Sequence, residues 1–154
     1  MIRSKRIITK IAVMTFFEAL YGSQYYEIQQ KGKDGNKGRL NANLFFTALI
    51  ILCLIAILMA SIYFTPGFSE NMNSMVRSVF KVSDGKSIGI LLGIPLMAII
   101  YLIVSSTIGN EKRFTQKVEA FMQYPEEIKK KANTKLLTPF FILLIFVTVL
   151  GFLS

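Results

Sequence analysis

The chain contains no histidine, no tryptophan and a single cysteine among its 154 residues. Histidine is the commonest metal ligand and general base in proteins, so its absence removes most metal-dependent and acid–base active sites from consideration. One cysteine can form neither an internal disulfide nor a zinc or iron–sulfur site. Acidic residues are scarce as well, 9 against 18 lysines and arginines. We therefore expect a protein that is not an enzyme and that uses no cofactor and no metal.

Charge is scarce overall, since 18% of the residues are charged and 53% are hydrophobic. A soluble domain has about 25% charged and about 45–50% apolar residues. A helix needs about 20 apolar residues to cross the hydrocarbon core of a bilayer. Three uncharged stretches meet this requirement, residues 44–64, 88–106 and 136–154. The sequence therefore predicts an all-α polytopic membrane protein with three transmembrane helices.

The distribution of lysine and arginine predicts the orientation of these spans. Eight precede the first span, three lie between the first and second spans, and seven lie between the second and third. Because cytoplasmic loops carry the excess of basic residues, we expect the N-terminus inside and the C-terminus outside. The membrane we expect is the bacterial cytoplasmic membrane.

Residues 1–30 have the pattern of an amphipathic helix. Arg3, Lys5 and Arg6 stand at its start, where they can contact anionic lipid headgroups. An apolar line follows at helical spacing: Ile7, Ile11, Met14, Phe17, Tyr21, Tyr25 and Ile28. Lys10 and Glu18 interrupt the apolar stretch, which disfavours a cleaved signal peptide. We expect an interfacial helix at the cytoplasmic surface; the alternative is a helix packed against protein.

Residues 31–43 are rich in glycine and lysine. They lack the pattern of a phosphate-binding loop, which also requires a preceding strand. We expect a flexible cytoplasmic linker, with Asn41 or Asn43 capping the first span.

Residues 107–135 predict a cytoplasmic helical hairpin. The second span is expected to continue as a helix to Tyr124, with Phe114, Val118 and Phe121 on one apolar face. Pro125 ends this helix, and the adjacent acids Glu126 and Glu127 mark the start of the next one. That helix is expected to run into the third span, with a kink or a new start at Pro139. The apolar face must pack on the other arm of the hairpin, on the N-terminal helix or on another subunit.

Basic residues of this hairpin are expected beside the inner headgroups, where each gains about 1 kcal/mol from anionic lipid. They are Lys129, Lys130, Lys131 and Lys135. No base-reading motif accompanies them, so we expect no nucleic-acid partner.

The outer loop, residues 65–87, begins with a turn and continues with a pattern typical of a short surface helix. Its apolar face comprises Met72, Met75, Val76 and Val79, and Ser69 is its expected N-cap.

Within the spans, the sequence indicates helix packing rather than catalysis or ion transport. None contains the ionisable residue that pumps and ion-coupled transporters usually carry at membrane depth, and Cys53 is expected to be an inert hydrophobe. Gly89 and Gly93 share one face of the second span and let a second helix approach closely, within the chain or between subunits. Pro95 is expected to bend this span.

Together these features predict a non-catalytic subunit, or an assembly or stabilising factor, of a membrane complex. Its partners would be anionic lipid and other membrane-protein subunits, or further copies of itself. The alternative is a membrane-perturbing homo-oligomer, such as a pore or defence effector, or an immunity protein against a toxin.

Overall fold

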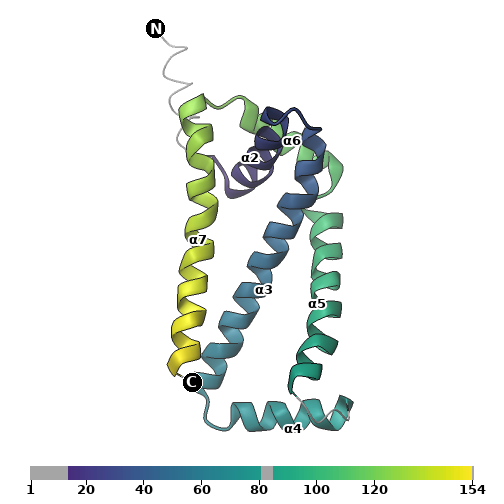
Figure 1. Ribbon diagram of the computed structural model, residues 1–154, viewed down its shortest axis with the longest axis vertical. Helices are drawn as coiled ribbons and strands as arrows, with labels where there is room; N and C mark the ends of the chain where they lie inside the picture. Colours follow the sequence, from purple (N-terminus) through teal and green to yellow (C-terminus); the bar gives the residue numbers. More distant parts are fainter. Residues whose placement is uncertain (1–13, 81–84, 154) are drawn as a thin grey trace.

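The computed structural model describes residues 14–80 and 85–153, with side chains for 14–79 and 92–153. The described residues form helices joined by short turns (Figure 1). In chain order these are α2 (Phe16–Gln30), the 3-10 turn η1 (Gly35–Lys37), α3 (Gly38–Phe64), α4 (Phe68–Phe80), α5 (Gly85–Thr107), α6 (Glu111–Met122) and α7 (Glu126–Leu153). The predicted all-α class is confirmed.

The three predicted spans fall in α3, α5 and α7. Within the described residues, the helical stretch that ends with α3 and the whole of α7 are each long and apolar enough to cross a membrane. The stretch Leu92–Thr107 passes the same test together with α6, from which it is bent by 67°. The protein is therefore membrane-embedded, with two such helices, or three when the bent pair counts as one span.

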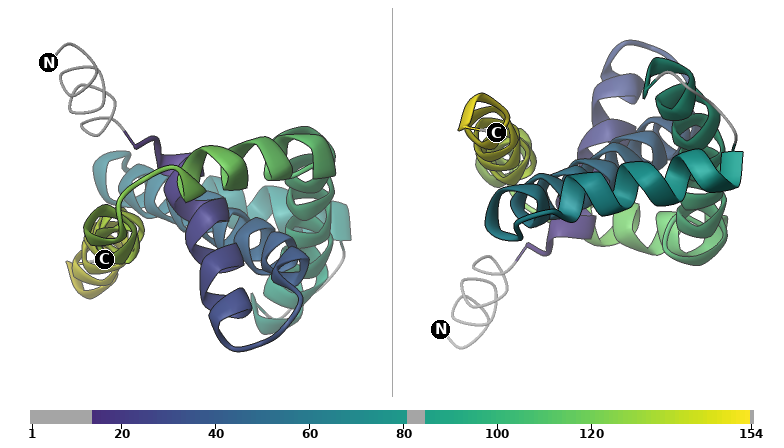
Figure 2. Two further views of the ribbon diagram at one scale, coloured as in Figure 1. Left: turned by 90° about the horizontal axis from the view of Figure 1, so that it is seen from above. Right: turned by 90° about the horizontal axis from the view of Figure 1, so that it is seen from below.

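The long helices separate two ends of the molecule (Figure 1). Helices α2 and α6 lie across one end, and α4 lies across the other, as the views from above and below also show (Figure 2). The described chain starts at the α2 end and finishes with α7 at the α4 end. This is the arrangement that an odd number of crossings produces.

Local signals explain where several helices begin. Thr15 and Glu18 form a capping box at the start of α2, each side chain bonding the other's backbone N–H. Asn110 caps α6 by accepting from the N–H of Arg113 at 3.0 Å. Before α4 the chain turns at Gly67, whose φ of 76° favours glycine. The predicted N-cap Ser69 lies inside α4, because this turn lets the helix start at Phe68.

The expected flexible linker is instead a packed turn. A Cβ atom at Gly35 would lie 2.6 Å from the Tyr25 ring, and one at Gly38 would lie 2.8 Å from the backbone of Gln24. These glycines therefore let the turn lie directly on α2. Helix α3 starts at Gly38, so Asn41 and Asn43 both lie inside it and neither is its N-cap.

The second span does not continue straight into the hairpin as predicted. Helix α5 ends at Thr107, and α6 starts at Glu111 after the 67° bend. Asn110 provides the new N-cap, and Gly109 lies against α3 where no side chain would fit. The second arm runs into the third span as predicted, since α7 extends from Glu126 to Leu153, and no new helix starts at Pro139.

Candidate functional site: a helical head on the spans

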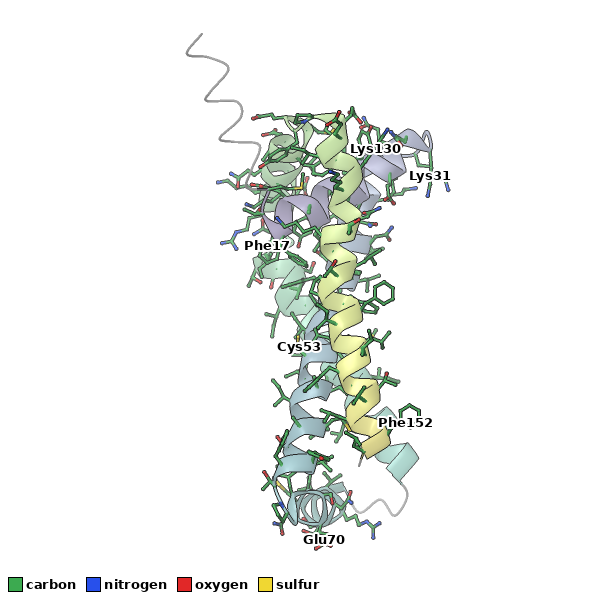
Figure 3. All side chains as sticks on the ribbon, turned by 90° about the vertical axis from the view of Figure 1, so that its left-hand side faces the viewer. Phe17, Lys31, Cys53, Glu70, Lys130 and Phe152 are labelled. Carbon is green, nitrogen blue, oxygen red and sulfur yellow. The ribbon has the colours of Figure 1, made fainter. Side chains whose placement is uncertain are left out.

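Helices α2 and α6, the turn η1 and the first turns of α3 and α7 form one packed unit, residues 14–43 and 108–136, which we name the head. Figure 3 places Lys31 and Lys130 at this end and Glu70 at the opposite end. Its buried apolar core comprises Met14, Ala19, Leu20, Tyr21, Ala42, Phe114, Val118, Phe121, Ala132 and Leu136.

The predicted apolar face of the hairpin packs inside this head. Phe114, Val118 and Phe121 are all buried. Phe121 lies so close to α2 that a Cβ atom at Gly22 would overlap its ring. Of the three coverings that the sequence left open, the face therefore uses the N-terminal helix, α2.

The described half of the N-terminal amphipathic segment faces protein. Met14 and Tyr21 are buried, while Phe17 and Tyr25 pack against the core. This corresponds to the alternative of packing against protein for residues from Met14 onward. Ile7, Ile11 and the predicted headgroup contacts Arg3, Lys5 and Arg6 lie outside the described residues.

A buried polar contact, which we name the Asn43 bridge, joins three parts of the head. The Tyr21 hydroxyl donates to Asn43 Oδ1 at 3.0 Å, and Asn43 Nδ2 donates to the carbonyl of Gly109 at 3.3 Å. Asn43 is 1% exposed, and burial raises the pKa of Tyr21 to about 12. The bridge connects α2, α3 and the bend between α5 and α6, and thereby fixes where α5 leaves the head.

Glu18 forms a second polar contact between α2 and α6. Besides capping α2, its carboxylate accepts from the hydroxyl of Tyr124 at 3.1 Å and lies 3.8 Å from the ammonium of Lys117. Burial by itself would raise the pKa of Glu18. The hydrogen bonds from Thr15 and Tyr124 and the charge of Lys117 outweigh that effect, so the pKa is lowered.

A third polar contact joins α2 to α7. Glu126 accepts from the Tyr26 hydroxyl at 2.6 Å and from the ammonium of Lys129 at 3.2 Å. These two hydrogen bonds lower the pKa of Glu126, and the bond to Glu126 raises the pKa of Tyr26. The ammonium of Lys129 also lies 5.4 Å from the centre of the Tyr26 ring, a cation–π distance.

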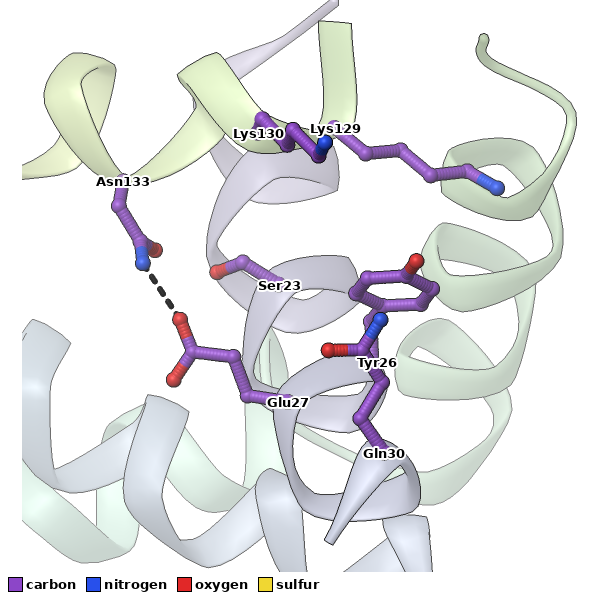
Figure 4. A pocket seen from close by; sticks show the side chains of 7 residues that line it. All are labelled: Ser23, Tyr26, Glu27, Gln30, Lys129, Lys130 and Asn133. Carbon is purple, nitrogen blue, oxygen red and sulfur yellow. Dashed lines mark hydrogen bonds between the residues drawn. The ribbon is translucent and has the colours of Figure 1, made fainter. Parts of the chain in front are cut away.

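A polar pocket of about 220 Å³ lies beside this contact, between α2 and α7 (Figure 4). Its lining residues are Ser23, Tyr26, Glu27, Gln30, Lys129, Lys130 and Asn133. Asn133 donates to Glu27 across it, as Figure 4 shows.

The four lysines of the hairpin that were predicted to contact lipid headgroups fall into two pairs, one bonded within the head and one exposed. Lys129 has a side chain only 8% exposed and bonds Glu126, and Lys135 donates to the carbonyl of Met14. These two ammonium groups therefore bond within the head. Lys130 and Lys131 are exposed, and their contact with lipid headgroups stays a prediction.

The predicted packing glycine Gly93 faces open space. A Cβ atom built there would meet no atom of the described residues within 4 Å. Every residue from Leu92 to Ile99 on α5 is likewise exposed. The described residues therefore place no helix against Gly93, and its role in helix packing stays a prediction. The side-chain surroundings of Gly89 lie outside the described residues.

Below the head, an apolar groove of about 440 Å³ lies between α3, α5 and α7. Its lining residues are Leu44, Thr47, Ala48, Ile51, Leu52, Ile55, Met97 and Phe140. Thr47 is the polar member of this set and is 2% exposed. Its hydroxyl finds no hydrogen-bond partner among the described residues.

Sequence reasoning missed the role of Asn43 and the burial of Thr47. The available signal was their spacing of four residues, which places two uncharged polar side chains on one face of a helix. Such a face is costly in lipid unless it is covered by protein.

The described residues bring together no group of three or more acidic, cysteine or histidine side chains able to hold a metal ion. Comparison of the chain with protein-family models, with curated proteins and with solved structures found no match.

Proposed function

We propose that this chain is a non-catalytic subunit or assembly factor of a membrane complex, which it joins through the exposed face of α5. The observation that carries the proposal is Gly93, which lies on an exposed apolar stretch with open space in front of it. A small residue in that position leaves room for the backbone of another helix.

The head supports this interpretation by contrast. Gly22 lies against the ring of Phe121, and Gly109 lies against the amide of Asn43. In each place the missing side chain permits a close contact that the chain itself fills. Gly93 offers the same close approach, and the described chain places nothing there.

Close van der Waals contact at small residues is a main source of helix association in lipid, where expulsion of water contributes little. A partner helix that packs on Gly93 therefore gains contact energy that flexible lipid chains supply less well. The Asn43 bridge supports the proposal further, because it fixes the direction in which α5 leaves the head and so presents this face in one orientation.

The head belongs on the cytoplasmic side in this proposal, in the cytoplasmic membrane of a bacterium. Its described residues carry 11 lysines and arginines and 7 acids. The described residues at the opposite end, 65–80, carry Arg77 and Glu70. The positive-inside rule then puts the N-terminus inside and the C-terminus outside.

Purification from native membranes in a mild detergent tests the function. We expect the wild-type chain to elute with partner subunits or as a defined oligomer, and Gly93→Leu to lower that assembly. Gly151→Leu is the matched control, since a Cβ there meets only the end of the Met59 side chain at 3.7 Å. A lone monomer in the wild-type sample would contradict the proposal. Rapid membrane depolarisation on overexpression, measured with a potential-sensitive dye, would favour a membrane-perturbing oligomer instead.

A further inference from the structure

Helix α4 is strongly amphipathic, and the proposed function does not use it. Five of its apolar side chains fall within an arc of about 100° at 3.6 residues per turn. We name this set the α4 arc; its members are Phe68, Met72, Met75, Val76 and Val79. The two charged residues of the helix, Glu70 and Arg77, project from the opposite side and are exposed. A stripe of this width is typical of a helix that lies on an apolar surface.

The α4 arc faces the side on which the long helices lie. Helix α4 lies across the ends of these helices rather than alongside them (Figures 1 and 2). Phe68, Met72 and Val76 are partly buried, while the polar residues on the opposite side of the helix are exposed. Met75 and Val79, in the same arc, are 68% and 63% exposed. The described chain therefore leaves much of the α4 arc uncovered.

The depth of α4 identifies what covers the arc. Below the head, α3 is uncharged over residues 44–64, a length of about 31 Å at 1.5 Å per residue. The hydrocarbon core of a bilayer is about 30 Å thick. A helix that enters this core below the head therefore leaves it near Phe64, and α4 starts at Phe68. The α4 arc then lies at the boundary between acyl chains and headgroups.

The end of α3 marks the same boundary. Tyr63 is 48% exposed and Phe64 is 73% exposed. Tyrosine is enriched where a span meets the membrane–water interface. The α4 arc follows these residues after one short turn, so it continues the lipid-facing surface of the span.

The charge of α4 identifies the kind of lipid surface that it fits. Interfacial helices bind through buried apolar area and through attraction of basic residues to anionic lipid. Helix α4 has one acidic and one basic residue, and the rest of its polar side consists of serines and asparagines. Only the apolar contribution is therefore available to α4, in contrast to the head, which has an excess of basic residues.

We infer that α4 is an interfacial helix that inserts the α4 arc among the lipids of the leaflet opposite the head, whatever the charge of those lipids. This lipid-binding surface is on a different helix from Gly93, so it does not depend on the proposed function.

Fluorescence quenching of the full chain in phosphatidylcholine nanodiscs tests this inference. A nanodisc that holds one copy leaves both membrane faces open to water. In a Cys53→Ser background, an environment-sensitive dye is attached at Met75→Cys in one variant and at Ser74→Cys in the other. These neighbours project from different sides of α4. The dye at position 75 should be quenched by lipids that carry a nitroxide near the ester groups and protected from iodide in the water. The dye at position 74 should show the reverse.

Two double variants, read with the dye at position 75, show which side of α4 holds it in the membrane. Met72→Ser with Val79→Ser removes apolar area from the arc, so quenching by lipid should be lost. Glu70→Ser with Arg77→Ser is the matched control with the same spacing, and it should leave the quenching unchanged. Adding phosphatidylglycerol to the nanodiscs should also change nothing. Circular dichroism establishes that each variant keeps its helix content.

Three results would overturn the inference. Equal access of iodide to positions 74 and 75 would place the α4 arc in water. Protection of position 75 from both quenchers would mean that protein covers the arc. Lipid quenching that appears only with phosphatidylglycerol would make charge, rather than the α4 arc, the source of binding.

Discussion

Replacing Asn43 with leucine should loosen the head more than any other single change to its polar contacts. The substitution removes both hydrogen bonds of the Asn43 bridge. It leaves the hydroxyl of Tyr21 without an acceptor and the carbonyl of Gly109 without this donor, both at a site where Asn43 is 1% exposed.

The magnitude follows from the cost of a buried polar group without a partner, about 1–3 kcal/mol each. Two such groups give an expected loss of about 2–6 kcal/mol in the free energy of unfolding of the head. The loss is smaller if water reaches the carbonyl of Gly109. Because leucine resembles asparagine in size, the change in packing contributes little by comparison.

Thermal unfolding in detergent, followed by the near-ultraviolet signal of tyrosine, measures this loss. The double variant with Tyr21→Phe separates the hydrogen bond from packing. Removing both partners leaves no orphaned hydroxyl, so the double variant should be less destabilised than the sum of the two single variants. The expected coupling energy is about 0.5–3 kcal/mol. If Asn43→Leu unfolds at the wild-type temperature, or the two effects simply add, the Asn43 bridge does not hold the head together.

Three further predictions concern the head and the orientation. Gly22→Ala should destabilise the head by about 1–3 kcal/mol, because the added methyl group overlaps the ring of Phe121 and forces the helices apart; denaturant unfolding that matches wild type would refute this close contact. Burial raises the pKa of Tyr21 from 10.0 to about 12, so the folded state retains its proton longer than the unfolded state. This contribution to stability is complete below pH 10 and is lost as the pH rises towards 12. The Tyr21→Phe variant should not show this part of the alkaline loss of stability. Identical alkaline unfolding curves for the variant and the wild type would contradict this prediction. For the orientation, single cysteines are placed in a Cys53→Ser background at Asn36, Ser74 and Thr134. A membrane-impermeant maleimide should label position 74 in intact cells and the other two only after lysis, whereas labelling of position 36 from outside would reverse the orientation.

The sequence predicted the parts of the fold that depend on composition and local signals. Uncharged runs placed α3, α5 and α7, because a helix in lipid needs an apolar surface along its whole length. Pro125 and the acids Glu126 and Glu127 predicted the break before α7. Such signals can be read from the sequence because a proline and the acids at a helix start affect only the backbone within about one turn.

The sequence did not predict the contacts that depend on distant residues. Asn43 was expected to cap a helix, which is the usual role of asparagine beside an apolar run. Its actual partners, Tyr21 and Gly109, are 22 and 66 residues away, and no local pattern identifies them. The glycines of residues 31–38 were expected to confer flexibility for a similar reason. The packing of Gly35 against Tyr25 and of Gly38 against Gln24 depends on the path of α2, which the local sequence does not specify.

The central claim is that α5 presents Gly93 to a partner helix, and photo-crosslinking in native membranes tests it most directly. A photoreactive amino acid replaces Leu96, an exposed residue of α5 one turn from Gly93, in one variant and Ile145, an exposed residue of α7, in another. We predict a protein adduct of defined mass from position 96 and lipid adducts alone from position 145. Lipid adducts alone from both positions would contradict the account, because the face of α5 would then be surrounded by lipid.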